Sequence, residues 1–260
     1  DSIIRNLKNL AESGESYFYS YIKLIKVLEQ NKSIETVFIE YTNNQITEEM
    51  ERWIWGDTYM QERYPKYSSF LTLSDKLLLI ENNFTGFINA FSLSLQKRLN
   101  RILTLNFNYT NNIGGYLFLE RYLGDKLDSL NSNYRDRFDP KNVSYTNIKY
   151  LEKIINLCRD RGKTVYLIRS PQHEKYVGYA NEELYQEIRN KHFAQIDYLD
   201  FSKFPLTNSE FGDLEHLNYR GAEIFSRWFT ELLRTSLLNR ENKQEYIDKE
   251  IILKKDRIQL

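Results

Sequence analysis

Apolar side chains recur at helical spacing in several stretches of the chain. Between about Glu15 and Gln30 they fall at Phe18, Tyr21, Ile22, Ile25 and Leu28, on one face of an amphipathic helix. The same period predicts helices from Thr146, an N-cap residue, to Arg161-Gly162, at 181–192, and from Asn218 onward. These segments supply the helical elements of the expected fold.

Short runs of β-branched and aromatic residues alternate with these helices. Strand-length runs lie at 36–41, 164–169 and 195–201, and a further short strand is expected at 6–11. Helices that alternate with short apolar strands are typical of a parallel sheet covered on both sides. The sequence therefore predicts an α/β protein, specifically a three-layer α/β/α sandwich.

Residues from about 45 to 145 interrupt this alternation. They contain helical patterns at roughly 73–82 and 84–104 and polar aromatic loops, without a series of strands. We interpret this region as a helical insertion in a single domain that covers residues 1–240. Residues 241–260 are highly charged and are expected to form a C-terminal extension, as a peripheral helix or tail.

Composition excludes several classes of function. The 36 basic residues equal the 36 acidic residues, so no electrostatic signature for nucleic acid or an anionic membrane is present. No apolar run approaches the roughly 20 residues that span a bilayer. The single cysteine, Cys158, cannot form an internal disulfide or a thiolate metal cluster. We therefore expect no nucleic-acid partner and no membrane span.

Metal and nucleotide cofactors are not indicated either. The three histidines are scattered, without the spacing or paired cysteines of a zinc site. Neither a G-x-G-x-x-G turn nor a Walker loop is present. The expected cofactor content is none.

The sharpest chemical signal is the segment 212–222, which contains Asp213 and His216 just before the last helix. Loops at the carboxyl ends of parallel strands form the ligand crevice of open α/β sheets. A D-x-x-H spacing lets the carboxylate bind Nδ1–H of the imidazole and directs Nε2 outward, which suits a general base. Taken alone, the same two residues also fit a helix-capping arrangement.

This segment, together with the Leu-Asn-x-x-Gly-Ala that follows His216, resembles the last sequence block of the SGNH/GDSL hydrolases. The resemblance implies a flavodoxin-like parallel sheet and assigns Asp213 and His216 to the acid–base end of a catalytic triad. It covers roughly residues 6–44 and 146–235. The family's oxyanion-hole glycine corresponds to Gly14 in Ser13-Gly14-Glu15. The family's G-x-N-D block corresponds to Tyr41-Thr42-Asn43-Asn44, with Asn43 as the side-chain donor, although Tyr41 and Asn44 replace the usual Gly and Asp.

The family's nucleophile, a serine in a G-D-S motif after the first strand, has no clear counterpart. Asp1-Ser2 retains two letters of the motif, but too few residues separate Ser2 from Gly14. We expect the first strand and its serine to lie upstream of Asp1. The implied function is serine-type ester hydrolysis or acyl transfer on a small molecule, an acylated carbohydrate or a cell-envelope molecule. The alternative is a carbohydrate-binding domain that lacks the nucleophile.

Three further residues are candidates for a substrate pocket. His173 follows a predicted strand, which would bring it to the same crevice, although a capping role is the simpler interpretation. Trp53 and Trp55 follow the Asn43 strand end and either shape an acyl or sugar pocket or form the core of the insertion. The resemblance also suggests an extracytoplasmic location.

Overall fold

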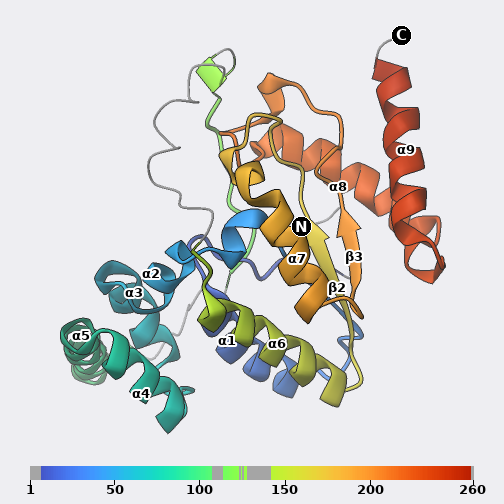
Figure 1. Cartoon of the computed structure of the whole chain (residues 1–260). Coiled ribbons are helices and arrows are strands. Elements are labelled where there is room, and N and C mark those ends of the chain that lie inside the picture. Colours follow the sequence, from blue (N-terminus) through green and yellow to red (C-terminus); the bar gives the residue numbers. More distant parts are fainter. Residues whose placement is uncertain (1–6, 107–113, 123, 125, 128–141, 259–260) are drawn as a thin grey trace.

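The computed structural model describes residues 7–106, 114–122, 124, 126–127 and 142–258. Figure 1 shows the order of the elements along the chain. The α-helices are α1 (Tyr17–Gln30), α2 (Glu49–Trp55), α3 (Asp57–Tyr67), α4 (Leu73–Asn82), α5 (Phe84–Leu103), α6 (Tyr145–Asp160), α7 (Glu182–His192), α8 (Tyr219–Arg234) and α9 (Lys243–Ile258). The strands are β1 (Thr36–Glu40), β2 (Thr164–Arg169) and β3 (Asp197–Asp200), and short 3-10 turns include η1 (Asn43–Ile46) and η5 (Asn208–Glu210).

The three strands form one parallel sheet in the order β1-β2-β3. Ile39 pairs with Leu167, and Leu167 pairs in turn with Tyr198. All three carboxyl ends consequently lie at one edge of the sheet, as parallel pairing requires. The prediction of an α/β protein with a parallel sheet is confirmed.

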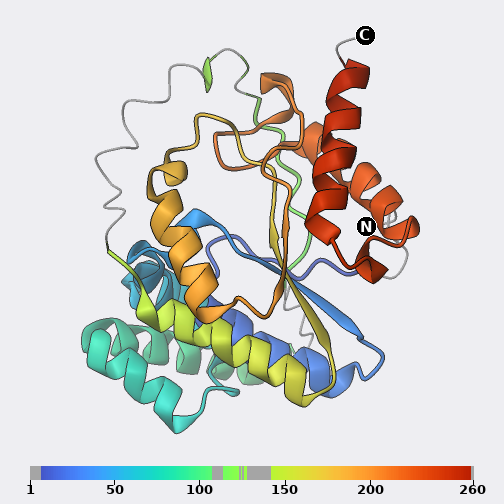
Figure 2. The same ribbon diagram turned by 45° about the vertical axis from the view of Figure 1, so that its right-hand side comes forward.

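Helices pack against both faces of this sheet (Figure 2). Ile39 and Leu167 point into a core shared with α1, α6 and α7. Phe38 and Tyr166 point to the other face, where they pack with residues of α8 and α9. This alternation follows from the two-residue period of a strand.

The two ends of the segment interpreted as a helical insertion are joined to each other. Thr47 and Val143 form an antiparallel bridge, with Glu48 N–H donating to Asn142 at 3.0 Å and Ser144 N–H to Ile46 at 2.9 Å. Helices α2 to α5 lie between these two points. The bridge brings the chain back to the sheet at the start of α6.

Two details differ from the sequence-based expectations. Residues 7–11 form no strand, because Asn9 Oδ1 accepts the N–H of Ala11 at 2.9 Å and Leu10 C=O accepts from Lys23 Nζ at 2.6 Å. Those bonds use polar groups that a sheet ladder would need. Residues 243–258 form a packed helix with buried Ile247 and Ile251, not a peripheral tail.

Cys158 is fully buried on α6, where burial raises the pKa of its thiol to about 11. It therefore acts as a small apolar side chain. No helix in the described part of the chain is long and apolar enough to cross a membrane.

Candidate functional site

The segment that carries Asp213 and His216 forms a tight loop between β3 and α8. Phe211 and Leu217 form an antiparallel bridge across it, and Gly212 N–H donates to the carbonyl of His216 at 2.8 Å. Asn218 ends the loop by capping α8, because its Oδ1 accepts from the N–H groups of Arg220 and Gly221. The loop is thus closed at its base and fixed to the helix that follows.

Asp213 and His216 form the expected pair. Nδ1 of His216 lies 3.0 Å from Oδ1 and 3.1 Å from Oδ2 of Asp213. The same Oδ1 also accepts the backbone N–H groups of Glu215 at 2.8 Å and His216 at 2.7 Å. The His216 side chain is 62% exposed, and its Nε2 has no hydrogen-bond partner among the described residues. The imidazole is therefore held through Nδ1 and presents Nε2 to solvent.

The electrostatics of the pair favour an ionised carboxylate beside a basic imidazole. The hydrogen bond with Asp213, together with the negative charges of Asp213 and Glu215, raises the pKa of His216 above its ordinary value. Burial acts to raise the pKa of Asp213, but the hydrogen bonds from His216 and the backbone lower it overall. Arg121 also forms an ion pair with Oδ2 of Asp213. This is the charge arrangement that a carboxylate-oriented general base requires.

His173 is hydrogen-bonded to this loop through its backbone and is held in place through both ring nitrogens. Its backbone N–H donates to the carbonyl of Leu214 at 3.0 Å, its Nδ1 accepts the N–H of Lys175 at 3.2 Å, and its Nε2 lies 2.9 Å from Asn208 Oδ1. Because Nδ1 accepts, Nε2 carries the proton and donates to Asn208. With both nitrogens occupied and the side chain buried, the geometry fits the simpler interpretation, in which His173 holds the loop, better than a role in lining a pocket.

Asn43 is buried in a polar network with Asn181, Glu182 and Arg169. Its Nδ2 donates to Asn181 at 3.0 Å and to Glu182 at 2.9 Å, and its Oδ1 accepts from Arg169. Arg169 also pairs with Glu182 at 2.8 Å. Since both amide protons of Asn43 are used inside the protein, the structure argues against the predicted role of Asn43 as an oxyanion donor.

The neighbouring Asn44 is the residue that reaches the Asp213–His216 loop. Thr42 Oγ1 donates to Asn44 Oδ1, which directs Nδ2 to the carboxylate of Glu215. Burial raises the pKa of Glu215, and the nearby charges of Asp213 and Glu49 act in the same direction. Sequence reasoning passed over Asn44, although it occupies the last position of the same four-residue block.

A second carboxyl group lies at this edge. Glu40, the last residue of β1, accepts the backbone N–H of Ser170 at 3.0 Å and its hydroxyl at 2.7 Å. Burial raises the pKa of Glu40, and the charge of Glu215 adds to that shift. The loops after β1 and β2 are thereby joined directly beside the candidate site.

Gly14 lies in the turn before α1, with a φ of 67° that favours glycine. The start of α1 reaches the same sheet edge, because Tyr17 Oη donates to the carbonyl of Glu40 at 2.6 Å. A Cβ at Gly14 would lie 3.0 Å from the ring of Tyr59. No hydrogen bond among the described residues joins Gly14 to the Asp213–His216 loop.

The two tryptophans of α2 serve the packing of the insertion. Trp53 stacks on Tyr59 with ring centroids 5.9 Å apart, and Trp55 packs against the main core. Neither makes a ring contact with the Asp213–His216 loop within the described residues. The interpretation as core of the insertion fits this geometry better than the interpretation as a substrate pocket.

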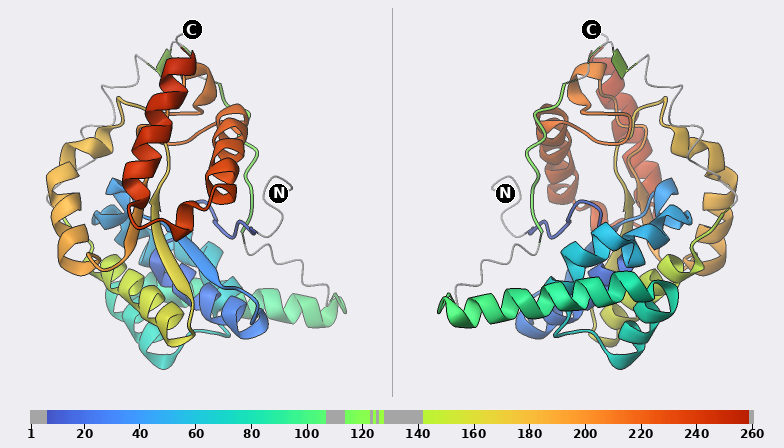
Figure 3. Two further views of the ribbon diagram at one scale, coloured as in Figure 1. Left: turned by 90° about the vertical axis from the view of Figure 1, so that its right-hand side faces the viewer. Right: turned by 90° about the vertical axis from the view of Figure 1, so that its left-hand side faces the viewer.

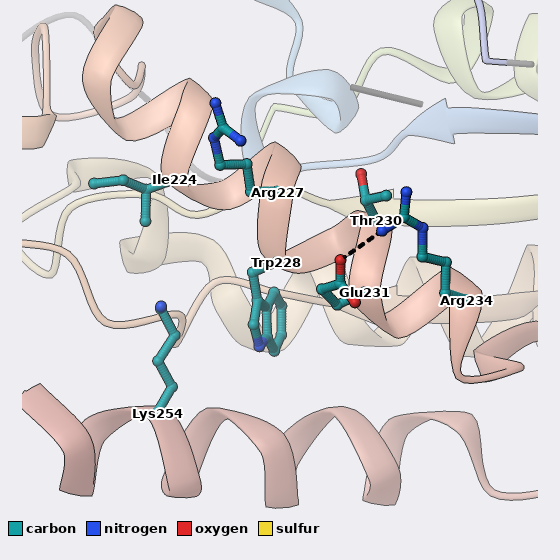
Figure 4. Close-up of a pocket in the computed structure, with 7 residues that line it drawn as sticks. All are labelled: Ile224, Arg227, Trp228, Thr230, Glu231, Arg234 and Lys254. Atoms are coloured by element: carbon teal, nitrogen blue, oxygen red, sulfur yellow. Dashed lines mark hydrogen bonds and ion pairs between the residues drawn. The ribbon is translucent and has the colours of Figure 1, made fainter. Parts of the chain in front are cut away.

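Two other features concern metal binding and the surface of the protein. Within the described ranges, no group of three or more His, Cys, Asp or Glu side chains is arranged to hold a metal ion. A surface hollow between α8 and α9 is lined by Trp228, Lys254 and neighbouring residues, with Glu231 paired to Arg234 at 2.9 Å (Figure 4). It contains neither Asp213 nor His216.

Comparisons with known proteins add little to this picture. A model of an uncharacterised protein family matches residues 125–238, less than half of the chain. That stretch includes β2, β3, the Asp213–His216 loop and α8. No curated protein and no solved structure matches.

Proposed function

We propose that this protein carries the acid–base part of an SGNH-type site, in a three-layer α/β/α sandwich, and acts in ester hydrolysis or acyl transfer. The observation that supports the proposal best is the His216 imidazole. It is held by Asp213 through Nδ1 and exposes Nε2 at the carboxyl edge of a parallel sheet. The sequence resemblance and this geometry agree on the same two residues.

In the proposed mechanism, His216 Nε2 takes the proton of a serine hydroxyl as the serine oxygen attacks the ester carbonyl carbon. Asp213 orients the ring and stabilises the imidazolium. The imidazolium then gives its proton to the leaving alcohol as the ester C–O bond breaks. Water, or an acceptor alcohol, releases the acyl group from the serine by the same steps in reverse.

The oxyanion donor in this proposal is Asn44, in place of the Asn43 that the motif suggests. Asn44 Nδ2 lies beside Glu215, two residues after Asp213, with its orientation set by Thr42. One amide proton of Asn44 is donated to Glu215, and the second is the one that would stabilise the developing negative charge. The substrate class, an acylated small molecule or carbohydrate, follows from the resemblance and from the aromatic content of the chain.

The competing proposal is a carbohydrate-binding domain without catalysis. One observation favours it: no serine hydroxyl among the described residues contacts His216, while Arg121 forms an ion pair with Asp213. Under this proposal the pair would orient a sugar hydroxyl without transferring an acyl group.

The experiment that separates the two is p-nitrophenyl acetate hydrolysis with fluorophosphonate labelling of the full-length protein. We expect His216→Ala and Asp213→Ala each to lower kcat/KM by about 10³-fold or more. His192→Ala is the matched control, because His192 forms a similar pair with Glu152 at 2.8 Å between α7 and α6.

Mapping the labelled peptide would identify the nucleophile. Labelling that is lost in His216→Ala and retained in His192→Ala supports the hydrolase. An inert wild-type protein without labelling would overturn the proposal, and sugar binding measured by calorimetry would then support the competing one.

A further inference from the structure

Helix α5 exposes a continuous apolar stripe. Its members follow one another at spacings of four, three, four, four and three residues, and Arg98 occupies the position that a strict alternation would give to the fifth member. They are between 41% and 62% exposed: Phe84, Ile88, Phe91, Leu95, Leu99 and Ile102. This heptad-like repeat is typical of a helix that packs along another helix.

The stripe is separate from the face that holds α5 to the protein. Phe87, Ala90 and Ser94 are buried, and Phe87 packs edge-on against Tyr64 of α3 with ring centroids 5.2 Å apart. Figure 3 shows the carboxyl-terminal part of α5 extending beyond the rest of the molecule. Phe91 also stacks on Phe87 with ring centroids 6.3 Å apart, so the stripe packs in part within the monomer, and its exposed remainder is open to a partner.

The exposed area is sufficient for a stable interface. At about 200 Å² for a large apolar side chain, the exposed fractions of the stripe sum to about 600 Å². A homodimer interface buries about 800 Å² on each partner, of which about 65%, or roughly 500 Å², is apolar. The stripe alone supplies that apolar part.

The charges along the helix set the direction of pairing. Residues 84–96 of α5 carry no charge, whereas Lys97, Arg98 and Arg101 follow within one and a half turns. The acidic side chains of Glu81 and Asp57 lie at the opposite, amino-terminal end, where Asp57 accepts from Asn83 at 2.7 Å. Parallel pairing would place the cations against each other, and antiparallel pairing places them against the uncharged amino-terminal half of the partner helix.

We propose that α5 is the interface of a two-fold symmetric homodimer, in which two copies of the helix pack antiparallel. In the register centred on residue 93, Phe91 of one copy faces the partner's Leu95, and Phe84 faces the partner's Ile102, as an isologous interface requires. A lipid surface fits less well. Residues 84–96 of the helix carry no charge and the cations Lys97, Arg98 and Arg101 are confined to its end, whereas helices that lie on anionic membranes carry lysines and arginines along their polar face.

The mass in solution tests the interface. We expect sedimentation velocity to show a dimer at about 100 µM and dissociation on dilution. The double variant Phe91→Glu/Leu95→Glu should be monomeric and keep a native far-ultraviolet circular dichroism spectrum, although its melting temperature should fall because Phe91 stacks on Phe87 within the monomer. Asn89→Glu/Gln96→Glu places the same charges on the neighbouring face and should remain dimeric.

Cysteine crosslinking tests the register. Mixing a Phe84→Cys protein with an Ile102→Cys protein should give disulfide-linked dimers under mild oxidation, and Ile102→Cys alone should give none. Cys158 is buried and does not interfere. A wild-type monomer at all concentrations, or a dimer that survives Phe91→Glu/Leu95→Glu, would overturn the proposal. So would a monomer that binds phosphatidylglycerol vesicles through this stripe.

Discussion

The Asp213–His216 pair makes the proposed activity depend on pH in a defined direction. Because the hydrogen bond to Asp213 raises the pKa of His216, the ring stays protonated above its ordinary titration range and becomes a competent base only at higher pH. We expect kcat/KM to rise with pH, with a midpoint above about 6.5. Asp213→Asn should move that midpoint down.

The same shift has a consequence for stability. A histidine whose pKa is raised by folding stabilises the native state below the pKa of the unfolded chain, and this contribution disappears as the pH passes the folded pKa.

NMR titration of the imidazole measures the pKa of His216 directly, without reference to a substrate. A His216 midpoint at or below that of an unstructured histidine, or one that Asp213→Asn leaves in place, would contradict the assignment.

The adjacent residues Asn43 and Asn44 should respond to substitution in different ways. Asn43→Ala removes the buried amide that accepts from Arg169 and donates to Glu182, and it should lower the free energy of unfolding by about 1–3 kcal/mol. Asn44→Ala removes the proposed oxyanion donor and should lower kcat by about 10²–10³-fold with little change in stability. Urea denaturation and ester hydrolysis on both variants check this, and a catalytic loss confined to Asn43→Ala would restore the motif-based assignment.

These residues also show what the sequence can and cannot reveal about the site. Asp213 and His216 were predictable because a single four-residue turn brings them together. Whether Asn43 or Asn44 faces the crevice depends on Arg169 of β2, which lies 126 positions after Asn43 in the sequence and donates a hydrogen bond to its side chain. The spacing of a motif carries no information about such a distant partner.

At the scale of elements, the accuracy of each prediction depends on how clear the local sequence pattern is. The strand at 164–169 and the helix at 73–82 have the predicted bounds, since one is a continuous apolar run and the other begins with a complete capping box at Thr72. The expected strand at 6–11 is wrong, because the bonds of Asn9 and Lys23 to its backbone were not visible in the apolar pattern. Helix α9 was expected to be peripheral because its sequence is highly charged. The few apolar residues through which it packs against the core form no clear pattern among these charges.

That contact makes α9 part of the fold. Ile247 is fully buried against β3 and α8, and Gln244 exchanges two hydrogen bonds with the backbone of Asp200. We expect Ile247→Ala to cost about 2–5 kcal/mol of unfolding free energy. Ile252→Ala is the control: Ile252 is 59% exposed, and its substitution should change stability by about 0.5 kcal/mol or less. Equal effects in urea denaturation would mean that α9 is peripheral.

At the scale of the whole molecule, the insertion shares its core with the sheet. Tyr67 of α3 donates to Glu15 at 2.6 Å, and Glu15 forms a buried ion pair with Lys23 of α1. Tyr19 of α1 donates to the carbonyl of Ile54 in α2 at 2.9 Å. Replacing either partner of these hydrogen bonds and ion pairs would leave a buried charge or polar group unpaired, which lowers the free energy of unfolding. The insertion is therefore continuous with the rest of the protein.

We therefore expect the insertion and the sheet to unfold together, although chains of this size often unfold in stages. The tryptophans report on the two parts separately, since Trp53 and Trp55 lie in α2 and Trp228 lies in α8. Trp228→Phe leaves only the insertion fluorescent, and Trp53→Phe/Trp55→Phe leaves only α8 fluorescent. Each variant's fluorescence midpoint in urea should coincide with its own far-ultraviolet circular dichroism midpoint. An earlier fluorescence transition in Trp228→Phe would show that the insertion is an independent unit, and that the Glu15–Lys23–Tyr67 cluster is too weak to couple it to the sheet.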